Sequence, residues 1–268
     1  MDRISDHLLA RRVRRTIGTT IVAIVAGASG AMAQSNLVTN GSFTSLGSLN
    51  STNSQIAAGS PSTLPGWSST VVGTSGGIAC VMIGVSNPAN ATPMCGTGYG
   101  TVSNAPYTYG TLTIFPGAPP GGGNVLAADS SSMYEQSISQ TIGNLVVGAT
   151  YTLTFQQAGA QQAGWTGNTT DQWDVTFGAS TQDSTLMSLT TANDVANWAS
   201  QTMIFTATAT SQTLTFLASG TPASDPPFAL LSDISLTKNV PEPLGFSVFS
   251  TCIAGLAGIR WLRRRSVV

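Results

Sequence analysis

Hydrophobic and polar residues alternate along several stretches in the middle of the chain. Between Thr150 and Gln156, large apolar side chains occupy every second position and threonines fill most of the positions between them. A period of two places alternate side chains on opposite faces of a β-strand, so each such stretch is predicted to be a strand with one buried face. The apolar positions that follow this pattern are Tyr151, Leu153, Phe155, Trp173, Val175, Phe177, Leu214 and Phe216.

Further strands are predicted from short apolar runs that are bounded by turn-forming residues. Residues 78–85 are apolar throughout, which is typical of a buried strand. No stretch between residues 34 and 239 keeps a helical period with caps. About ten strands in about 200 residues predict one all-β domain, an antiparallel β-sandwich or jelly roll. The remaining predicted strands are residues 37–38, 124–128, 136–142, 203–205 and 228–236.

The first 33 residues have the pattern of a signal peptide. Arginines at positions 11, 12, 14 and 15 precede the apolar residues 17–28, which are predicted to form a signal helix. Ala31 and Ala33 then supply the small side chains of a cleavage site, so the mature chain is expected to begin at Gln34. With the C-terminal segment described next, this leaves residues 34–239 as the part of the chain expected to fold.

The last 29 residues combine a proline-rich linker, an apolar segment and a basic tail. Proline fixes φ and lacks an N–H, so residues 240–243 are expected to be an extended linker. Residues 244–262 are predicted to form a single transmembrane helix if the side chain of Arg260 snorkels to the interface. The basic tail, residues 263–268, would then stay on the cytoplasmic side. The defining residues are Pro241, Glu242, Pro243, Arg263, Arg264 and Arg265.

This order of Pro-Glu-Pro, a short transmembrane helix and a terminal arginine cluster resembles the PEP-CTERM sorting signal of Gram-negative bacteria. The resemblance implies export through the inner membrane and an exosortase-type membrane protease as a partner, which removes the tail. The body would then reach the cell surface or the extracellular matrix of exopolysaccharide that forms a biofilm. The alternative is a permanent membrane anchor with a purely structural role at the surface.

Charge is distributed unevenly between the ends and the body. All nine arginines lie in the two targeting ends, so residues 34–239 keep one base, Lys238, against eight acids and have a net charge of −7. Nucleic-acid binding depends on clustered basic side chains that displace counterions from the phosphates. A body without arginine has no such basic patch, so nucleic-acid binding is excluded.

The body contains no histidine, because His7 precedes the cleavage site. This excludes Ser-His-Asp and Cys-His catalysis and zinc sites with imidazole ligands, so no catalytic residue is assigned and a non-enzyme is expected. The alternative is a glycan-active enzyme that uses two carboxylates. The candidate pairs are Asp171 with Asp174, which should lie on opposite faces of a strand, and Asp129 with Glu135. A solubilising surface position is favoured for each of these acids.

Cys80 and Cys95 are the two cysteines of the body. In an exported protein they are expected to form a disulfide that closes a small loop, worth about 3 kcal/mol in the chain-entropy model. A reactive thiol pair is the weaker interpretation, because no base or cation lies nearby in the sequence to lower a thiol pKa.

Short segments along the body also resemble secreted galactose-binding-like β-sandwiches, the fold of many carbohydrate-binding modules. The resemblance implies this fold for residues 34–239 and a structural calcium ion near the chain ends. Only Asp233 matches the acids of that site, because Thr44 stands where an acid usually follows the Asn-Gly-x-Phe turn. No other cofactor is expected. The segments are 36–43, 64–67, 137–142, 150–155, 205–208 and 231–236.

Candidate ligand-binding residues gather between two predicted strands. Trp165 lies between glycines in a predicted loop, where its ring can stack on a sugar, whereas Trp67, Trp173 and Trp198 have the pattern of core or strand-end packing. Tyr107 and Tyr109 form a second candidate. The sequence thus predicts a surface protein that binds polysaccharide without catalysis, through Trp165, Gln161, Gln162, Asn168 and Asp171.

Overall fold

The computed structural model describes residues 34–49, 54–59, 62–83, 116–161, 167–190, 195–225 and 227–240. Contacts divide the chain into two units, Met1–Ala33 and Gln34–Val268, and every described residue belongs to the second. The predicted signal peptide, Pro-Glu-Pro motif, C-terminal helix and basic tail therefore lie outside the described residues. Within the described part, no helix has the length and hydropathy needed to cross a membrane.

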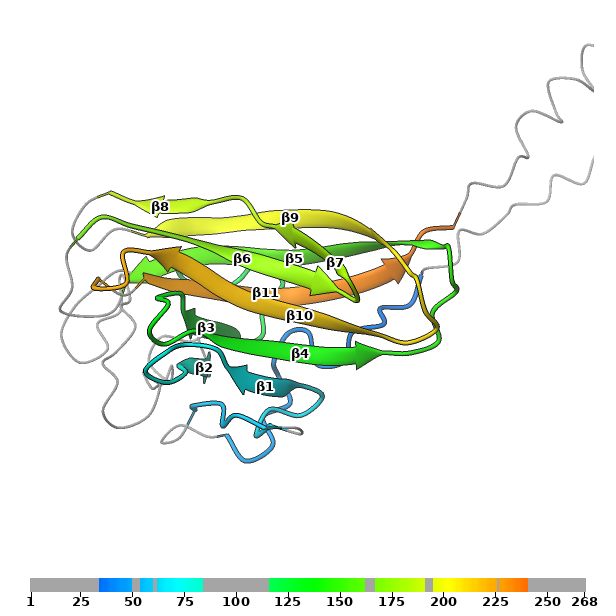
Figure 1. The fold of residues 1–268 in the computed structure, drawn as a ribbon, viewed down its shortest axis with the longest axis horizontal. Coiled ribbons are helices and arrows are strands. Elements are labelled where there is room, and N and C mark those ends of the chain that lie inside the picture. The colour runs from blue at the N-terminus through cyan, green and yellow to red at the C-terminus, as the bar shows by residue number, and fades with distance from the viewer. Residues whose placement is uncertain are drawn as a thin grey trace, which may run out of the picture. The chain divides into compact units, whose positions relative to one another are not determined.

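The described residues form eleven strands in two antiparallel sheets that pack face to face (Figure 1). The first sheet has the order β1-β4-β10-β6-β7, with β8 also paired to β6, and the second has the order β2-β3-β11-β5-β9. The predicted all-β antiparallel sandwich is thus confirmed. The strands are β1 Ser68–Val71, β2 Ala79–Met82, β3 Val125–Asp129, β4 Gln136–Ile142, β5 Thr150–Gln161, β6 Thr169–Phe177, β7 Ser180–Asp183, β8 Met187–Leu189, β9 Ala196–Thr206, β10 Gln212–Thr221 and β11 Pro227–Lys238.

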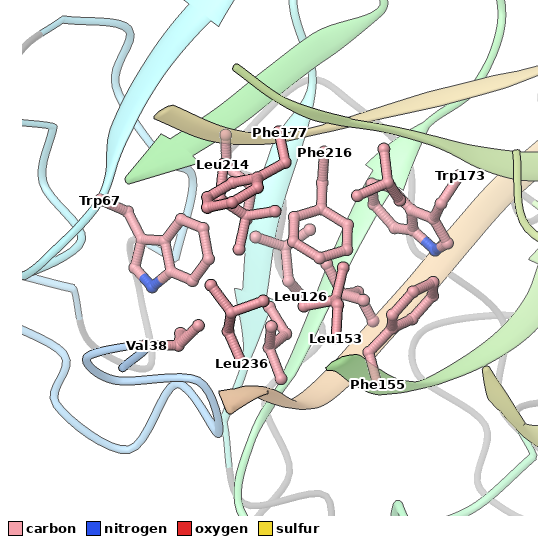
Figure 2. Packing of buried hydrophobic residues seen from close by; sticks show 14 of the residues in the cluster. Val38, Trp67, Leu126, Leu153, Phe155, Trp173, Phe177, Leu214, Phe216 and Leu236 are labelled. Carbon is pink, nitrogen blue, oxygen red and sulfur yellow. The ribbon is translucent and has the colours of Figure 1, made fainter. Parts of the chain in front are cut away.

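An aromatic layer between the sheets forms the centre of the core (Figure 2). Phe216 of β10 lies at its middle, with ring centroids 5.3 Å from Phe155, 6.1 Å from Trp173 and 6.3 Å from Trp67. All three contacts are edge-to-face, the arrangement that aromatic quadrupoles favour. The alternation in the sequence therefore placed the core side chains correctly, and the core positions predicted for Trp67 and Trp173 are confirmed.

The N-terminal segment closes one end of the sandwich by docking on β11. Leu37 N–H donates to the Leu236 carbonyl, and Ile234 N–H donates to the Gly41 carbonyl. An added Cβ at Gly41 would collide with the Ile234 carbonyl oxygen, so this close approach of two backbones requires glycine. Residues 37–38, predicted as a strand, carry this backbone bond but form no strand.

Three strands at sheet edges were not predicted from the sequence. β1, β7 and β8 are only three or four residues long, and β1 and β7 consist mainly of serine, threonine and other polar residues. β1 and β7 lack the apolar alternation that marks a half-buried strand, and β8, although it alternates, is only three residues long, too short to show a pattern. β5 also extends to Gln161, five residues beyond its predicted end, and this extension positions the polar residues discussed below.

Candidate functional site

The structure describes three of the five residues predicted to bind a ligand, namely Gln161, Asn168 and Asp171. Trp165 and Gln162 lie outside the described residues, as do Tyr107 and Tyr109. Asn168 is exposed, whereas Gln161 and Asp171 are fully buried. The Gln161 amide nitrogen donates to the Gly167 carbonyl and to Asp225 Oδ1, both at 3.0 Å. Of the described members of this set, Asn168 alone presents its side chain to solvent.

The surface position favoured for the acids is wrong for Asp129 and Asp171. Asp171 lies on the inward face of β6 beside Trp173, and burial raises the pKa of its carboxyl well above the usual value. Asp129 ends β3 and is also fully buried; burial raises its pKa to about 7 despite a hydrogen bond from Ser131 N–H, and Glu135 adds a smaller repulsion. Asp171 shares the inward face of β6 with Trp173, whereas Asp129 is buried on the face of β3 that carries Val125 and Ala127.

Asp171 and Asp174 lie on opposite faces of β6, as predicted from their spacing. Asp174 is on the outer face, where its Oδ1 accepts hydrogen bonds from Gln172 Nε2 and Ser219 Oγ, both at 3.0 Å. One of the two candidate catalytic pairs is therefore split between the core and the surface.

The described part of the molecule contains an open groove of about 650 Å³ at the edge of the first sheet. It lies between the N-terminal segment, the turn that precedes β1, and the end of β4 with the residues that follow it. A volume between about 300 and 1,000 Å³ is typical of small-molecule sites. The lining residues are Asn36, Leu37, Thr39, Gly66, Trp67, Ser68, Ser139, Gln140, Thr141, Gly143 and Asn144.

Two amides, the buried Gln140 and the exposed Asn36, hold the walls of the groove in place. Gln140 of β4 accepts a hydrogen bond from Thr39 N–H at 2.7 Å and donates to the carbonyls of Thr39 at 2.9 Å and Gly66 at 2.7 Å. Asn36 accepts from the N–H groups of Val38 and Leu236 and donates to the Ile234 carbonyl. Five of these six bonds tie together residues between 74 and 200 positions apart in the chain, so the groove is preorganised.

The rim of the groove offers hydrogen-bonding groups without charge. Thr39, Thr141 and Asn144 have exposed side chains, and Ser139 is half-buried. No Asp, Glu, Lys or Arg is among the described lining residues. Trp67 is only 2% exposed, and its indole N–H donates to the Asn40 carbonyl, so its ring packs under the groove rather than offering a stacking surface. The groove is suited to a neutral, polar ligand.

Asp233, the one acid that matches the implied calcium site, is bound by the protein backbone. Asp233 adopts a φ of 54° at the irregularity in β11, and its Oδ2 accepts a hydrogen bond from Gly121 N–H at 2.9 Å. Among the described residues, no three His, Cys, Asp or Glu side chains gather into a metal site. Cys80 is buried in β2, and Cys95 lies outside the described residues, so their disulfide stays a prediction.

The profile of a family described as "Protein of unknown function (DUF642)" matches residues 124–231. No curated protein sequence matches the chain.

Solved structures that resemble the chain include sugar-binding proteins. TmCBM61 in complex with β-1,4-galactotriose is 15% identical, with a TM-score of 0.40 over 76% of this chain and 99% of its own. A protein from Bacteroides thetaiotaomicron VPI-5482, named for sugar binding, is 14% identical, with a TM-score of 0.34 over 76% of this chain and 100% of its own. The enzymatically active domain of bacteriophage CBA120 tailspike protein 4 is 12% identical, with a TM-score of 0.38 over 76% of this chain and 21% of its own. At these identities and scores, the ligands of those proteins carry no implication for this chain.

The groove was not predicted from the sequence, because its walls come from three separated segments. None of these segments contains an exposed aromatic or charged residue that would mark a site. The one local signal was the turn Leu64-Pro65-Gly66-Trp67, which indicated a chain reversal but not the strand against which it packs.

Proposed function

We propose that this protein is a non-catalytic module that binds a neutral segment of polysaccharide in the groove beside β4. The observation that carries the proposal is a preorganised groove whose described lining offers amide and hydroxyl groups and no charge. Sugar hydroxyls both donate and accept hydrogen bonds, so they match the free side chains of Thr141 and Asn144. Because the groove is open to solvent, it can accept a segment from within a long chain.

The charge of the body supports a neutral ligand over an acidic one. Residues 34–239 carry eight acids and the single base Lys238, so an anionic polysaccharide would be repelled. Since Trp67 is buried, affinity would come from hydrogen bonds that largely replace those made to water, and each such bond adds little. Weak, rapidly exchanging binding is therefore expected for a single groove.

The absence of catalysis is part of the proposal. Glycoside hydrolysis by paired carboxylates requires two carboxyl groups about 5–10 Å apart around the scissile bond. The described lining of the groove offers amide, hydroxyl and apolar groups and no carboxyl, so a bound glycan would have no acid or nucleophile beside it.

Glycan binding is tested by titrating the protein with neutral oligosaccharides and with the exopolysaccharide of the producing cells. Thr141→Val and Asn144→Gly remove rim groups; glycine is chosen because Asn144 has a φ of 58°. The matched control is Thr202→Val, an exposed position on β9 of the other sheet. Saturable binding that the rim double variant loses and the control keeps is the expected result.

Two outcomes would overturn the groove as the binding site. Equal binding by the wild type and the rim double variant removes the groove from the mechanism. Loss of binding in Trp165→Ala, together with full binding in the rim variant, moves the site to the loop predicted from the sequence. Release of reducing ends from the exopolysaccharide by the wild type would refute the non-catalytic assignment.

Export and sorting to the cell surface complete the proposal. Support comes from the signal peptide pattern with Ala31, Ala33 and Gln34, and from the Pro-Glu-Pro motif, apolar segment and arginine cluster at the C-terminus. The test is the intact mass of the mature protein from its producing cells. A mass that ends near Pro243 supports processing by an exosortase-type protease, whereas a mass that retains residues 263–268 supports the permanent anchor.

A further inference from the structure

Buried oxygen atoms without a hydrogen-bond partner gather where β5 ends and β6 begins. Among the described residues, seven buried side-chain polar atoms lack a partner, and five of them belong to this place. All five are oxygens. They are Gln157 Oε1, Gln161 Oε1, Thr169 Oγ1, Asp171 Oδ1 and Asp171 Oδ2.

The four side chains point into the space between the two sheets. Asp171 and Thr169 leave the inward face of β6, two residues apart and therefore about 6.6 Å along the strand. Gln157 and Gln161 share strand parity with the core side chains of β5 and flank Gly159 on either side. Gly159 faces the carboxylate directly, because an added Cβ there would lie 3.4 Å from Asp171 Oδ2. The carboxylate thus enters the space that a glycine leaves open.

The orientation of both glutamine amides is fixed by the bonds of their nitrogen atoms. Gln157 Nε2 donates to the Thr185 carbonyl at 2.7 Å, and Gln161 Nε2 donates to the Gly167 carbonyl and to Asp225. Because these partners are acceptors, each amide must present its nitrogen to them and keep its oxygen for another partner. The cluster therefore holds four oxygens that can only accept when Asp171 is ionised, and the Thr169 hydroxyl is the one donor among the five atoms.

No base of the body can neutralise Asp171. Lys238 is the one basic residue between 34 and 239, and it pairs with Tyr151 at the start of β5, eight residues or about 26 Å along the strand from Gly159. Asp171 is fully buried and neither carboxylate oxygen has a hydrogen-bond partner, and burial of an isolated carboxylate is costly. Either a proton or a bound cation must compensate the charge.

We infer that this cluster is a calcium site, in which Asp171 binds the ion and Thr169, Gln157 and Gln161 supply neutral oxygens. Calcium takes six to eight oxygen ligands and accepts carboxylates, amide carbonyls and water, whereas magnesium requires a stricter octahedron and zinc prefers nitrogen and sulfur. One carboxylate gives a weak site, so a Kd of roughly 10⁻⁴–10⁻³ M, the range of extracellular calcium modules, is expected. This location is separate from Asp233 at the bulge of β11, and it does not depend on the groove.

The experiment measures thermal unfolding of the whole protein in EDTA, in 5 mM CaCl2 and in 5 mM MgCl2. The wild type should gain about 3–6 °C in calcium and much less in magnesium, from mass action at roughly ten times Kd. Asp171→Asn keeps the shape of the side chain and removes its charge, so this variant should show no calcium response. Asp233→Asn and Asp183→Asn are the matched controls and should respond like the wild type.

A direct measurement of calcium binding by the wild type keeps the inference testable if Asp171→Asn fails to fold. Equilibrium dialysis of the wild type should give about one calcium per chain, and Gln161→Leu, which removes one neutral ligand, should weaken binding several-fold. The inference is overturned if wild-type dialysis shows no calcium, or if Asp233→Asn rather than Asp171→Asn abolishes the response. A wild type that is indifferent to calcium beside an equally or more stable Asp171→Asn would identify Asp171 as a neutral, protonated core residue instead.

Discussion

Gln140 offers the sharpest test of how the groove is held together. Its amide makes three hydrogen bonds, one from Thr39 N–H and two to the carbonyls of Thr39 and Gly66. The side chain is only 7% exposed. Gln140→Met keeps the length and volume of the side chain and removes all three bonds. The variant therefore separates hydrogen bonding from packing.

The expected loss of stability follows from those three bonds. Each hydrogen bond contributes about 0.5–1.5 kcal/mol net, so their sum is roughly 1.5–4.5 kcal/mol. The partner groups lie at partly buried positions where water can replace the amide in part, which favours the lower half of that range. A loss of roughly 1.5–3 kcal/mol lowers Tm by about 3–12 °C for a domain of this size.

Urea unfolding monitored by tryptophan fluorescence measures this loss, because Trp67 lies directly under the groove. The control is Gln172→Met, a half-buried glutamine on β6 with one hydrogen bond, to Asp174, and an expected cost below about 1 kcal/mol. A Gln140→Met cost below that of Gln172→Met would refute the reasoning. If the groove also binds glycan, Gln140→Met should weaken that binding even at temperatures where the variant is fully folded.

Three further predictions follow from the core, the buried acids and the N-terminal turn. Phe216→Ala should cost roughly 3–5 kcal/mol in urea unfolding, because it empties the centre of the aromatic layer, while Thr213→Ala on the exposed face of the same strand should stay within about 0.5 kcal/mol. Burial raises the folded-state pKa of Asp129 to about 7, so the stability that its protonated form contributes is complete below the unfolded pKa near 4 and is lost as the pH rises through 7. The midpoint of urea unfolding, measured in EDTA, should therefore fall between about pH 4 and 7. Asp129→Asn should make this fall shallower. A slope that is unchanged in the variant would show that Asp129 is not its source. Gly41→Ala should lower Tm strongly, because the added Cβ would meet the Ile234 carbonyl oxygen. A fall in Tm of less than 2 °C, which corresponds to a loss of stability below about 1 kcal/mol, would contradict the close docking of the N-terminal segment.

The architecture was predictable where strands are long and one face is buried. β5, β6 and β10 have clear alternation, and their apolar residues form the aromatic layer as expected. The same alternation indicates that Asp171 is buried, because residues 171, 173, 175 and 177 lie on one face of β6. Acidic side chains generally favour solvent, but the two-residue period of this strand places Asp171 among the buried residues. In this strand the geometric period was the stronger indicator.

The groove could not be predicted, since it depends on which distant segments meet. Gln140 binds Thr39, about 100 residues earlier in the chain, while its own strand, β4, pairs with β1 and β10. An amide in the sequence gives no sign of whether it will bind solvent, a ligand or another part of the backbone. Only the assembled sheets show that the amide of Gln140 is already used and that Thr141 and Asn144 are free.

β10 connects the two candidate sites and also separates them. Its Leu214 pairs with Gln140 at the groove, and its Gly220 pairs with Asp171 at the buried cluster, six residues or about 20 Å away. The aromatic layer around Phe216 fills the interior between them. Large apolar side chains close the middle of the sandwich, and the polar side chains of the two candidate sites lie on either side of this layer. Their placement follows from the packing of the core rather than from any motif in the sequence.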